Sequence, residues 1–160
     1  MLECDTPMAD VKKDFLRHFI ATIAYRARKA IGGAPVGFAT FDAGHGVRKP
    51  VEILFHMSGV MLHAESFFVS AKVERMPIGS WEQEVARFFR VLAKIDQLLA
   101  SRAELNGRTE EQLLQGPFAD AMTHIGQLAM LRRMSGSSIP KEDFDEVTIR
   151  VGDVGLRSIG

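Results

Sequence analysis

Residues 50–68 read PVEILFHMSGVMLHAESFF, and their helical projection is apolar in nearly every direction. Pro50 suits the first turn of a helix, because a helix makes no use there of the N–H group that proline lacks. We expect this helix to run to about Val73 and to be packed on most of its sides. The exceptions gather on one narrow stripe, which forms either a solvent face or the polar wall of an internal cleft: Glu52, His56, Gly59, His63 and Ser66.

An apolar helix needs partners, and two segments on either side of it have the periodicity of amphipathic helices. Thr6 and Pro7 predict the start of a helix that ends at residues 32–33, with apolar side chains at four-residue spacing: Val11, Phe15, Phe19 and Ile23. Ser80 and Gln83 form a capping box that opens another helix, which we expect to end before Asn106-Gly107. Both segments can cover the helix at residue 50.

A fourth helical region begins at the capping box of Thr109 and Gln112. Gly116-Pro117 must kink or restart it, because proline breaks the backbone hydrogen-bonding pattern of a helix. It ends near Gly136, and the residues after it have no clear period. The sequence therefore predicts an all-α fold, a four-helix bundle with a short irregular C-terminal tail, and a single domain over residues 1–160.

The composition fits an ordinary globular domain. The chain has 160 residues, of which 46% are hydrophobic and 25% charged. A domain of this length buries roughly two-thirds of its unfolded surface, so neither a disulfide nor a metal is needed to explain its folding.

Charge and cysteine content argue against several classes of protein. Lysine plus arginine balance aspartate plus glutamate at 20 each, and no basic face is clustered, so we expect neither nucleic acid nor a membrane as a partner. No apolar run approaches the about 20 residues of a membrane span, and the start of the chain does not resemble a signal peptide. Cys4 is the only cysteine. We therefore expect a cytoplasmic location.

Asp120 and His124 are the strongest local indication of chemistry. They are one helical turn apart, so their side chains leave the same face and can converge on one ion. Such pairs also occur as ordinary ion pairs, and a metal site needs a third ligand from another helix. His56 is the natural candidate, because it begins the polar stripe of the apolar helix and bundles build metal sites between facing helices. His63, two turns further on, could take its place, could lie in the cleft, or could do neither.

Two segments resemble one known family. VEILFHMSGVMLHAESFF at residues 51–68 and DAMTHIGQLAMLRRMSG at residues 120–136 are similar to the DinB-like superfamily of metal-binding four-helix bundles. The resemblance extends from the first helix through Gly136 and is most specific from His124 onward. It implies metal ligands at His56, Asp120 and His124.

The sequence departs from the family at Asp120, where many members have histidine. Carboxylate is a competent ligand that shifts the preference toward harder ions. We expect one divalent metal ion, zinc or nickel, with iron or manganese as alternatives. Glu52, one turn before His56, is either a residue that orients this histidine or simply a solvated glutamate.

The resemblance also implies a range of activities. Members of the family with known reactions are metal-dependent transferases and isomerases that use low-molecular-weight thiols such as mycothiol, bacillithiol or glutathione. We expect either a thiol S-transferase or hydrolase acting on a small molecule, or a non-catalytic metal-binding or ligand-binding protein, in each case as a homodimer. No residue can be assigned as a catalytic acid, base or nucleophile from the sequence.

Overall fold

The computed structural model describes residues 8–70 and 76–156, and the part it describes is helical without strands. Three long helices are followed by a fourth helical region in three pieces. The elements are α1 (Met8–Ile31), the 3-10 turn η1 (Phe38–Thr40), α2 (Pro50–Glu65), α3 (Trp81–Ala100), α4 (Glu110–Leu113), the π-helical turn η2 (Leu114–Phe118) and α5 (Ala119–Met134). The predicted all-α class with four main helices is confirmed.

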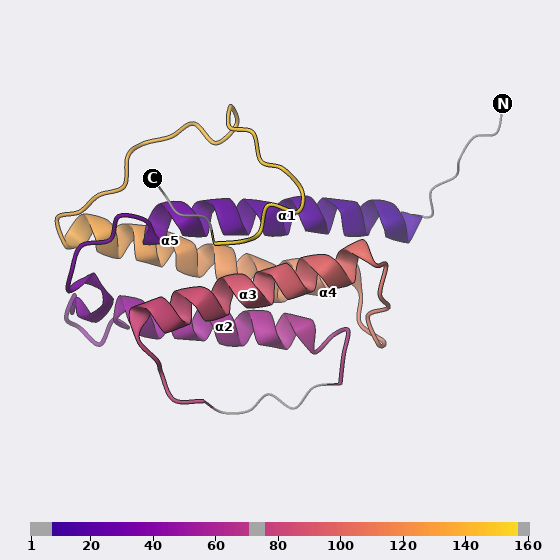
Figure 1. Ribbon diagram of the computed structural model, residues 1–160, viewed down its shortest axis with the longest axis horizontal. Coiled ribbons are helices and arrows are strands. Elements are labelled where there is room, and N and C mark those ends of the chain that lie inside the picture. The colour runs from indigo at the N-terminus through magenta and orange to yellow at the C-terminus, as the bar shows by residue number, and fades with distance from the viewer. Residues whose placement is uncertain (1–7, 71–75, 157–160) are drawn as a thin grey trace.

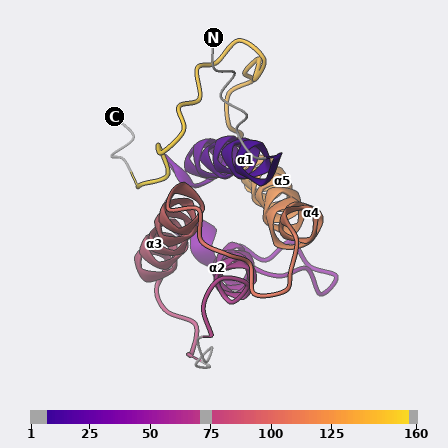
Figure 2. The same ribbon diagram turned by 90° about the vertical axis from the view of Figure 1, so that its right-hand side faces the viewer.

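The helices form a four-sided bundle in which α1 lies diagonally opposite α2, and α3 opposite α5 (Figure 2). Each of α1 and α2 packs against both α3 and α5. Figure 1 shows that α1 and α5 run in one direction while α2 and α3 run in the other. The parallel pair α2 and α3 therefore requires the chain to return from one end of the bundle to the other between them.

Helix starts agree with the capping signals. The Ser80 hydroxyl accepts a hydrogen bond from the Gln83 N–H at 3.2 Å, and the Gln83 side chain accepts one from the Ser80 N–H at 2.8 Å. Thr109 and Gln112 make the same reciprocal pair at the start of α4. These contacts satisfy donors that a helix leaves free at its first turn. The predicted capping residues Thr6 and Pro7 lie outside the described residues.

Two predictions about the first two helices need correction. We expected α2 to continue to Val73, but it ends at Glu65, and Val73 lies outside the described residues. The N–H groups of Phe67 and Phe68 donate to carbonyl groups only three residues back, so this segment turns and buries both rings against the bundle. Their apolar character reflects burial in a turn, which helical periodicity cannot distinguish from burial in a helix.

In α1, the four-residue apolar run does not mark the buried face. Phe15 is 73% exposed and Val11 is 41% exposed, whereas Ile23 is fully buried. Four residues advance a helix by about 400°, so a strict four-residue repeat drifts around the helix by about 40° at each step. The face that packs is the neighbouring one, formed by Leu16, Ile20, Ile23, Ala24 and Ala27.

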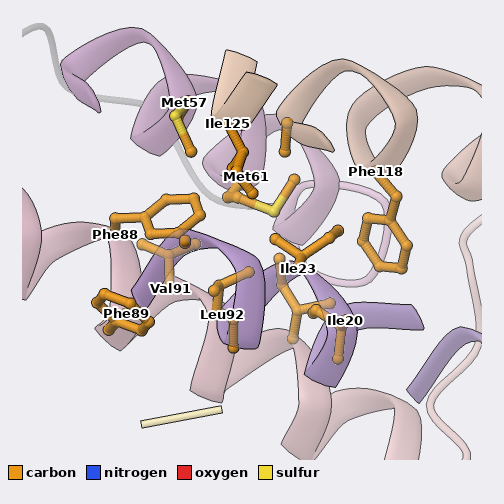
Figure 3. Packing of buried hydrophobic residues seen from close by; sticks show 14 of the residues in the cluster. Ile20, Ile23, Met57, Met61, Phe88, Phe89, Val91, Leu92, Phe118 and Ile125 are labelled. Atoms are coloured by element: carbon orange, nitrogen blue, oxygen red, sulfur yellow. The ribbon is translucent and has the colours of Figure 1, made fainter. Parts of the chain in front are cut away.

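The core lies along the axis of the bundle and draws on all four sides (Figure 3). Met57 and Met61 from α2 meet Phe88 and Leu92 from α3, and all four are fully buried. Burial of these side chains leaves the opposite face of α2, with His56 and His63, outside the core. Packing therefore determines which side of α2 is available for chemistry.

The C-terminal residues run back over α1 without regular structure, as predicted (Figure 1). Tyr25 donates a hydrogen bond to Glu142 at 2.6 Å, and Arg28 donates one to the Gly155 carbonyl oxygen at 2.8 Å. Val154 is 5% exposed and belongs to the core cluster. This segment is thus fastened to α1 at several points along its length.

None of the helices in the described part of the chain is both long enough and apolar enough to cross a membrane.

Candidate metal centre

Three predicted ligands from two helices meet where α2 packs against α5. His56 belongs to α2, while Asp120 and His124 are one turn apart on α5. One ligand atom from each of the three residues can be chosen so that all lie within 4.8 Å of one another. His56 Nε2 is 3.7 Å from Asp120 Oδ2, and the imidazole centroids of His56 and His124 are 4.6 Å apart. The group could hold a metal ion.

The start of α5 depends on the π-helical turn η2. Pro117 lies inside this turn and cannot donate a backbone hydrogen bond, so the chain takes a wider turn there rather than a regular α-helical one. The extra residue rotates the faces of α5 relative to α4, and Asp120 follows two residues later. Single π-helical turns inside helices are frequent at functional sites. The sequence predicted a kink or a restart at Gly116-Pro117, and the structure has a π-helical turn there that interrupts the α-helical pattern.

A hydrogen bond within α5 orients His124. Its Nδ1 atom lies 2.7 Å from the main-chain carbonyl oxygen of Asp120. Because a carbonyl oxygen can only accept, Nδ1 carries the proton, and the lone pair of the neutral ring is on Nε2. Metal-binding histidines commonly donate their other ring N–H in this way, which sets the ring orientation. His124 is therefore prepared to act as a ligand through Nε2.

The three side chains differ in their exposure to solvent. His124 is 9% exposed, whereas His56 and Asp120 are 38% and 44% exposed. Burial is the main cause that lowers the pKa of His56, and the neighbouring His124 lowers it further, while Asp120 acts in the opposite direction. A lowered pKa keeps the His56 imidazole neutral, which is the form that binds metal.

The donor set suits a divalent transition metal. An ion bound at about 2.1 Å holds neighbouring ligand atoms roughly 3.0–3.5 Å apart, so ligand atoms that lie within 4.8 Å of one another need to approach by about 1–2 Å. The exposed side chains of His56 and Asp120 are free to make this adjustment. Two imidazoles and one carboxylate leave coordination positions for water or substrate, as in catalytic sites.

The centre opens into a cleft of about 900 Å³ between α2 and the α4–α5 region. His56, Gly59 and His63 of the predicted polar stripe line one side of it, and Asp120 lines the other. The middle of the stripe therefore lines an open cleft, whereas Glu52 and Ser66 do not line it. A second hollow of about 360 Å³ also reaches His56, from the side of Glu52 and Arg48.

The structure separates the residues whose roles were left open. Glu52 Oε2 accepts a hydrogen bond from the Lys49 N–H at 2.7 Å, so this carboxylate caps α2 and is not directed at His56. His63 lines the cleft beside Phe67, at a ring centroid distance of 5.2 Å, and does not belong to the group of three. His56 is therefore the better candidate for the third ligand.

Sequence reasoning missed the cleft residues that follow Asn106-Gly107. Arg108, Gln112 and Gln115 line the cleft opposite α2. The sequence does contain an Asn-Gly pair that predicts a turn, and in the structure this turn brings the chain back toward α2. A predicted turn does not by itself show which helix the chain then approaches.

A comparison of the chain with protein-family models, with curated proteins and with solved structures finds no match.

Proposed function

We propose that the protein is an enzyme of the DinB-like type that depends on a divalent metal ion and acts on a small molecule, as a thiol S-transferase or a hydrolase. The observation that carries this proposal is the convergence of His56, Asp120 and His124 at the edge of an open cleft. The ligand set of two imidazoles and one carboxylate supports zinc or nickel, with iron or manganese as alternatives. The family assignment itself rests on the resemblance described above.

The bound ion would supply Lewis acidity, lowering the pKa of a thiol or water so that a nucleophile exists at neutral pH. The protein's own residues provide orientation and charge. The helix carbonyl group of Asp120 holds the His124 ring, and the Asp120 carboxylate offsets part of the positive charge at the centre. The cleft gives a thiol and an electrophile room to bind side by side.

In the transferase reaction, the sulfur atom of the thiol forms a bond to an electrophilic carbon atom. The bond from that carbon to its leaving group breaks, and the thiol proton passes to solvent. In the hydrolase reaction, water takes the place of the thiol, and an acyl or similar bond is cleaved. Both reactions require the same centre and differ in which nucleophile the cleft admits.

Turnover measured with and without metal tests this proposal. The metal-free protein is reconstituted separately with zinc, nickel, iron and manganese, and is assayed for conjugation of glutathione to chlorodinitrobenzene and for hydrolysis of nitrophenyl esters. We expect turnover only in a metal-loaded form, with its loss in Asp120→Asn and its retention in Glu52→Gln. An ion that binds without any turnover across a wider set of thiols and esters would instead favour a non-catalytic binding protein. The homodimer stays a prediction.

A further inference from the structure

One arginine lies in the cleft at a distance from the candidate metal centre. The guanidinium carbon of Arg108 is 5.2 Å from the centre of the Phe67 ring. The His63 imidazole approaches the same ring edge-on, also with 5.2 Å between ring centroids. Phe67 is only 5% exposed, so it is a fixed platform for both side chains. All three residues line the cleft that contains His56 and Asp120.

The backbone around Arg108 is fastened to the end of α2. Asn106 and Gly107 have φ values of 43° and 80°, which form a tight turn that Asn and Gly accommodate well. The Asn106 side-chain amide donates a hydrogen bond to the Phe68 carbonyl oxygen at 2.7 Å, and the Arg108 N–H donates one to Leu105 at 2.8 Å. These bonds hold the turn against the residue next to Phe67. Arg108 therefore faces the cleft from an anchored position.

The charges in the cleft are unbalanced once a metal is present. Among the described residues, Asp120 is the only carboxylate that lines this cleft, and it belongs to the candidate metal centre. Arg108 makes no ion pair with any carboxylate in the described part of the chain, whereas Arg17 and Arg102 are each paired with aspartate. A guanidinium group presents a planar pair of donors that matches a carboxylate. An anionic ligand would restore the balance.

The spacing of the histidines along the cleft indicates how long such a ligand is. His56 and His63 are seven residues apart on α2, which corresponds to about 10 Å along the helix axis. A short chain of several carbon atoms spans that distance. The amide side chains of Gln112 and Gln115 lie along the same cleft and can donate additional hydrogen bonds.

We propose that Arg108, which lies over the ring of Phe67, is a specificity-determining residue that binds the carboxylate of the substrate. The site would then take a small acid with a metal-binding group at one end and a carboxylate at the other. This inference rests on the proposed function, because the metal centre holds the other end of the ligand.

Binding of matched thiol ligands tests the inference in zinc-loaded protein. The probes are mercaptohexanoate, its methyl ester and the shorter mercaptopropionate, and their affinities are measured by calorimetry. In the parent protein, we expect mercaptohexanoate to bind about tenfold more tightly than its ester, as for one charged hydrogen-bonding contact made by an exposed side chain. Arg108→Gln should remove this preference, and Arg108→Lys should restore part of it. The exposed Arg133 lies outside the cleft lining, so Arg133→Gln is the control and should keep the full preference.

Two further readouts separate this inference from the metal proposal. Metal content of Arg108→Gln should equal that of the parent. Mercaptopropionate is shorter than the about 10 Å between His56 and His63 along α2, so it should bind parent and variant equally. An ester that binds as tightly as the acid, or a preference that survives in Arg108→Gln, would overturn the inference and leave the metal proposal intact.

If the parent binds no metal, the subsite is tested in the metal-free protein by nuclear magnetic resonance. Hexanoate should then shift the side-chain signals of His63 and Gln112 in the parent but not in Arg108→Gln, with hexanol as the neutral control. Equal responses to hexanoate in the two proteins would overturn the subsite.

Discussion

Arg132→Met should destabilise the bundle strongly, because Arg132 connects the end of α5 to the end of α1. The side chain is 5% exposed, and it donates hydrogen bonds of 2.8–3.1 Å to the carbonyl oxygens of Ala30, Gly32 and Gly33. Its Nε also donates to Ser137 at 2.9 Å. Carbonyl groups at the end of a helix lack intrahelical partners and carry the negative end of the dipole. One buried cation therefore caps another helix.

The expected loss of stability depends on which of these carbonyl groups can bind water once the arginine is replaced. The hydrogen bond to Ala30 is buried, whereas the bonds to Gly32 and Gly33 are only partly buried. Methionine keeps most of the length of the side chain but leaves the Ala30 carbonyl group without a partner. Hydrogen bonds to charged groups are worth about 1.5–3 kcal/mol, so we expect the free energy of unfolding to fall by about 3 kcal/mol.

The assay is urea unfolding of metal-free protein followed by circular dichroism, with Arg133→Met as the matched control. Arg133 is the adjacent residue but is exposed, so its replacement should change the free energy of unfolding by less than about 0.5 kcal/mol. A loss below about 1 kcal/mol for Arg132→Met, or equal losses for the two variants, would refute the capping role.

Three further predictions concern the core, a helix start and pH. Phe88 is fully buried, so Phe88→Ala should lower the free energy of unfolding in urea by about 3–5 kcal/mol. Phe15 is exposed, so Phe15→Ala should lower it by less than about 0.5 kcal/mol. Similar losses for the two variants would contradict the described core. Ser80→Ala should lower the free energy of unfolding by about 1 kcal/mol, because it removes the side chain that caps α3. An unchanged midpoint of urea unfolding would argue against that cap. The pKa of His56 is lowered from 6.5, so between the folded pKa and 6.5 the unfolded chain binds more protons. The stability of metal-free protein should then rise as the pH rises toward 6.5 and fall as the pH is lowered, and His56→Gln should remove that part of the change. An identical pH dependence in parent and variant would contradict it.

Features that depend on neighbouring residues in the chain were predictable from the sequence. The capping boxes at Ser80 and Thr109 are local hydrogen-bonding patterns, and the interruption of the α-helix at Pro117 follows from the missing N–H group. The pairing of Asp120 with His124 also follows from one helical turn. Each of these predictions requires no knowledge of how the helices pack.

Features that depend on packing were predicted less well. His56 could be joined to Asp120 and His124 only through the logic of bundles and the resemblance, and the structure then brought the three together. The end of α2 was placed too late, because the buried Phe67 and Phe68 continue the apolar pattern beyond the helix. The role of Arg132 was also missed, since its acceptors lie about 100 residues away, in the last turn of α1 and just after it.

Metal content of tag-free protein, measured by mass spectrometry, tests the proposed centre most directly. We predict about one zinc or nickel ion per chain in the parent, and less than about a tenth of that in His56→Ala, Asp120→Ala and His124→Ala. Circular dichroism verifies that each variant is folded. His63→Ala is the matched control, because it removes a histidine from the same cleft and should leave the content unchanged. Absence of any ion after reconstitution with zinc, nickel, iron and manganese, or equal content in all four variants, would contradict a metal centre at these residues.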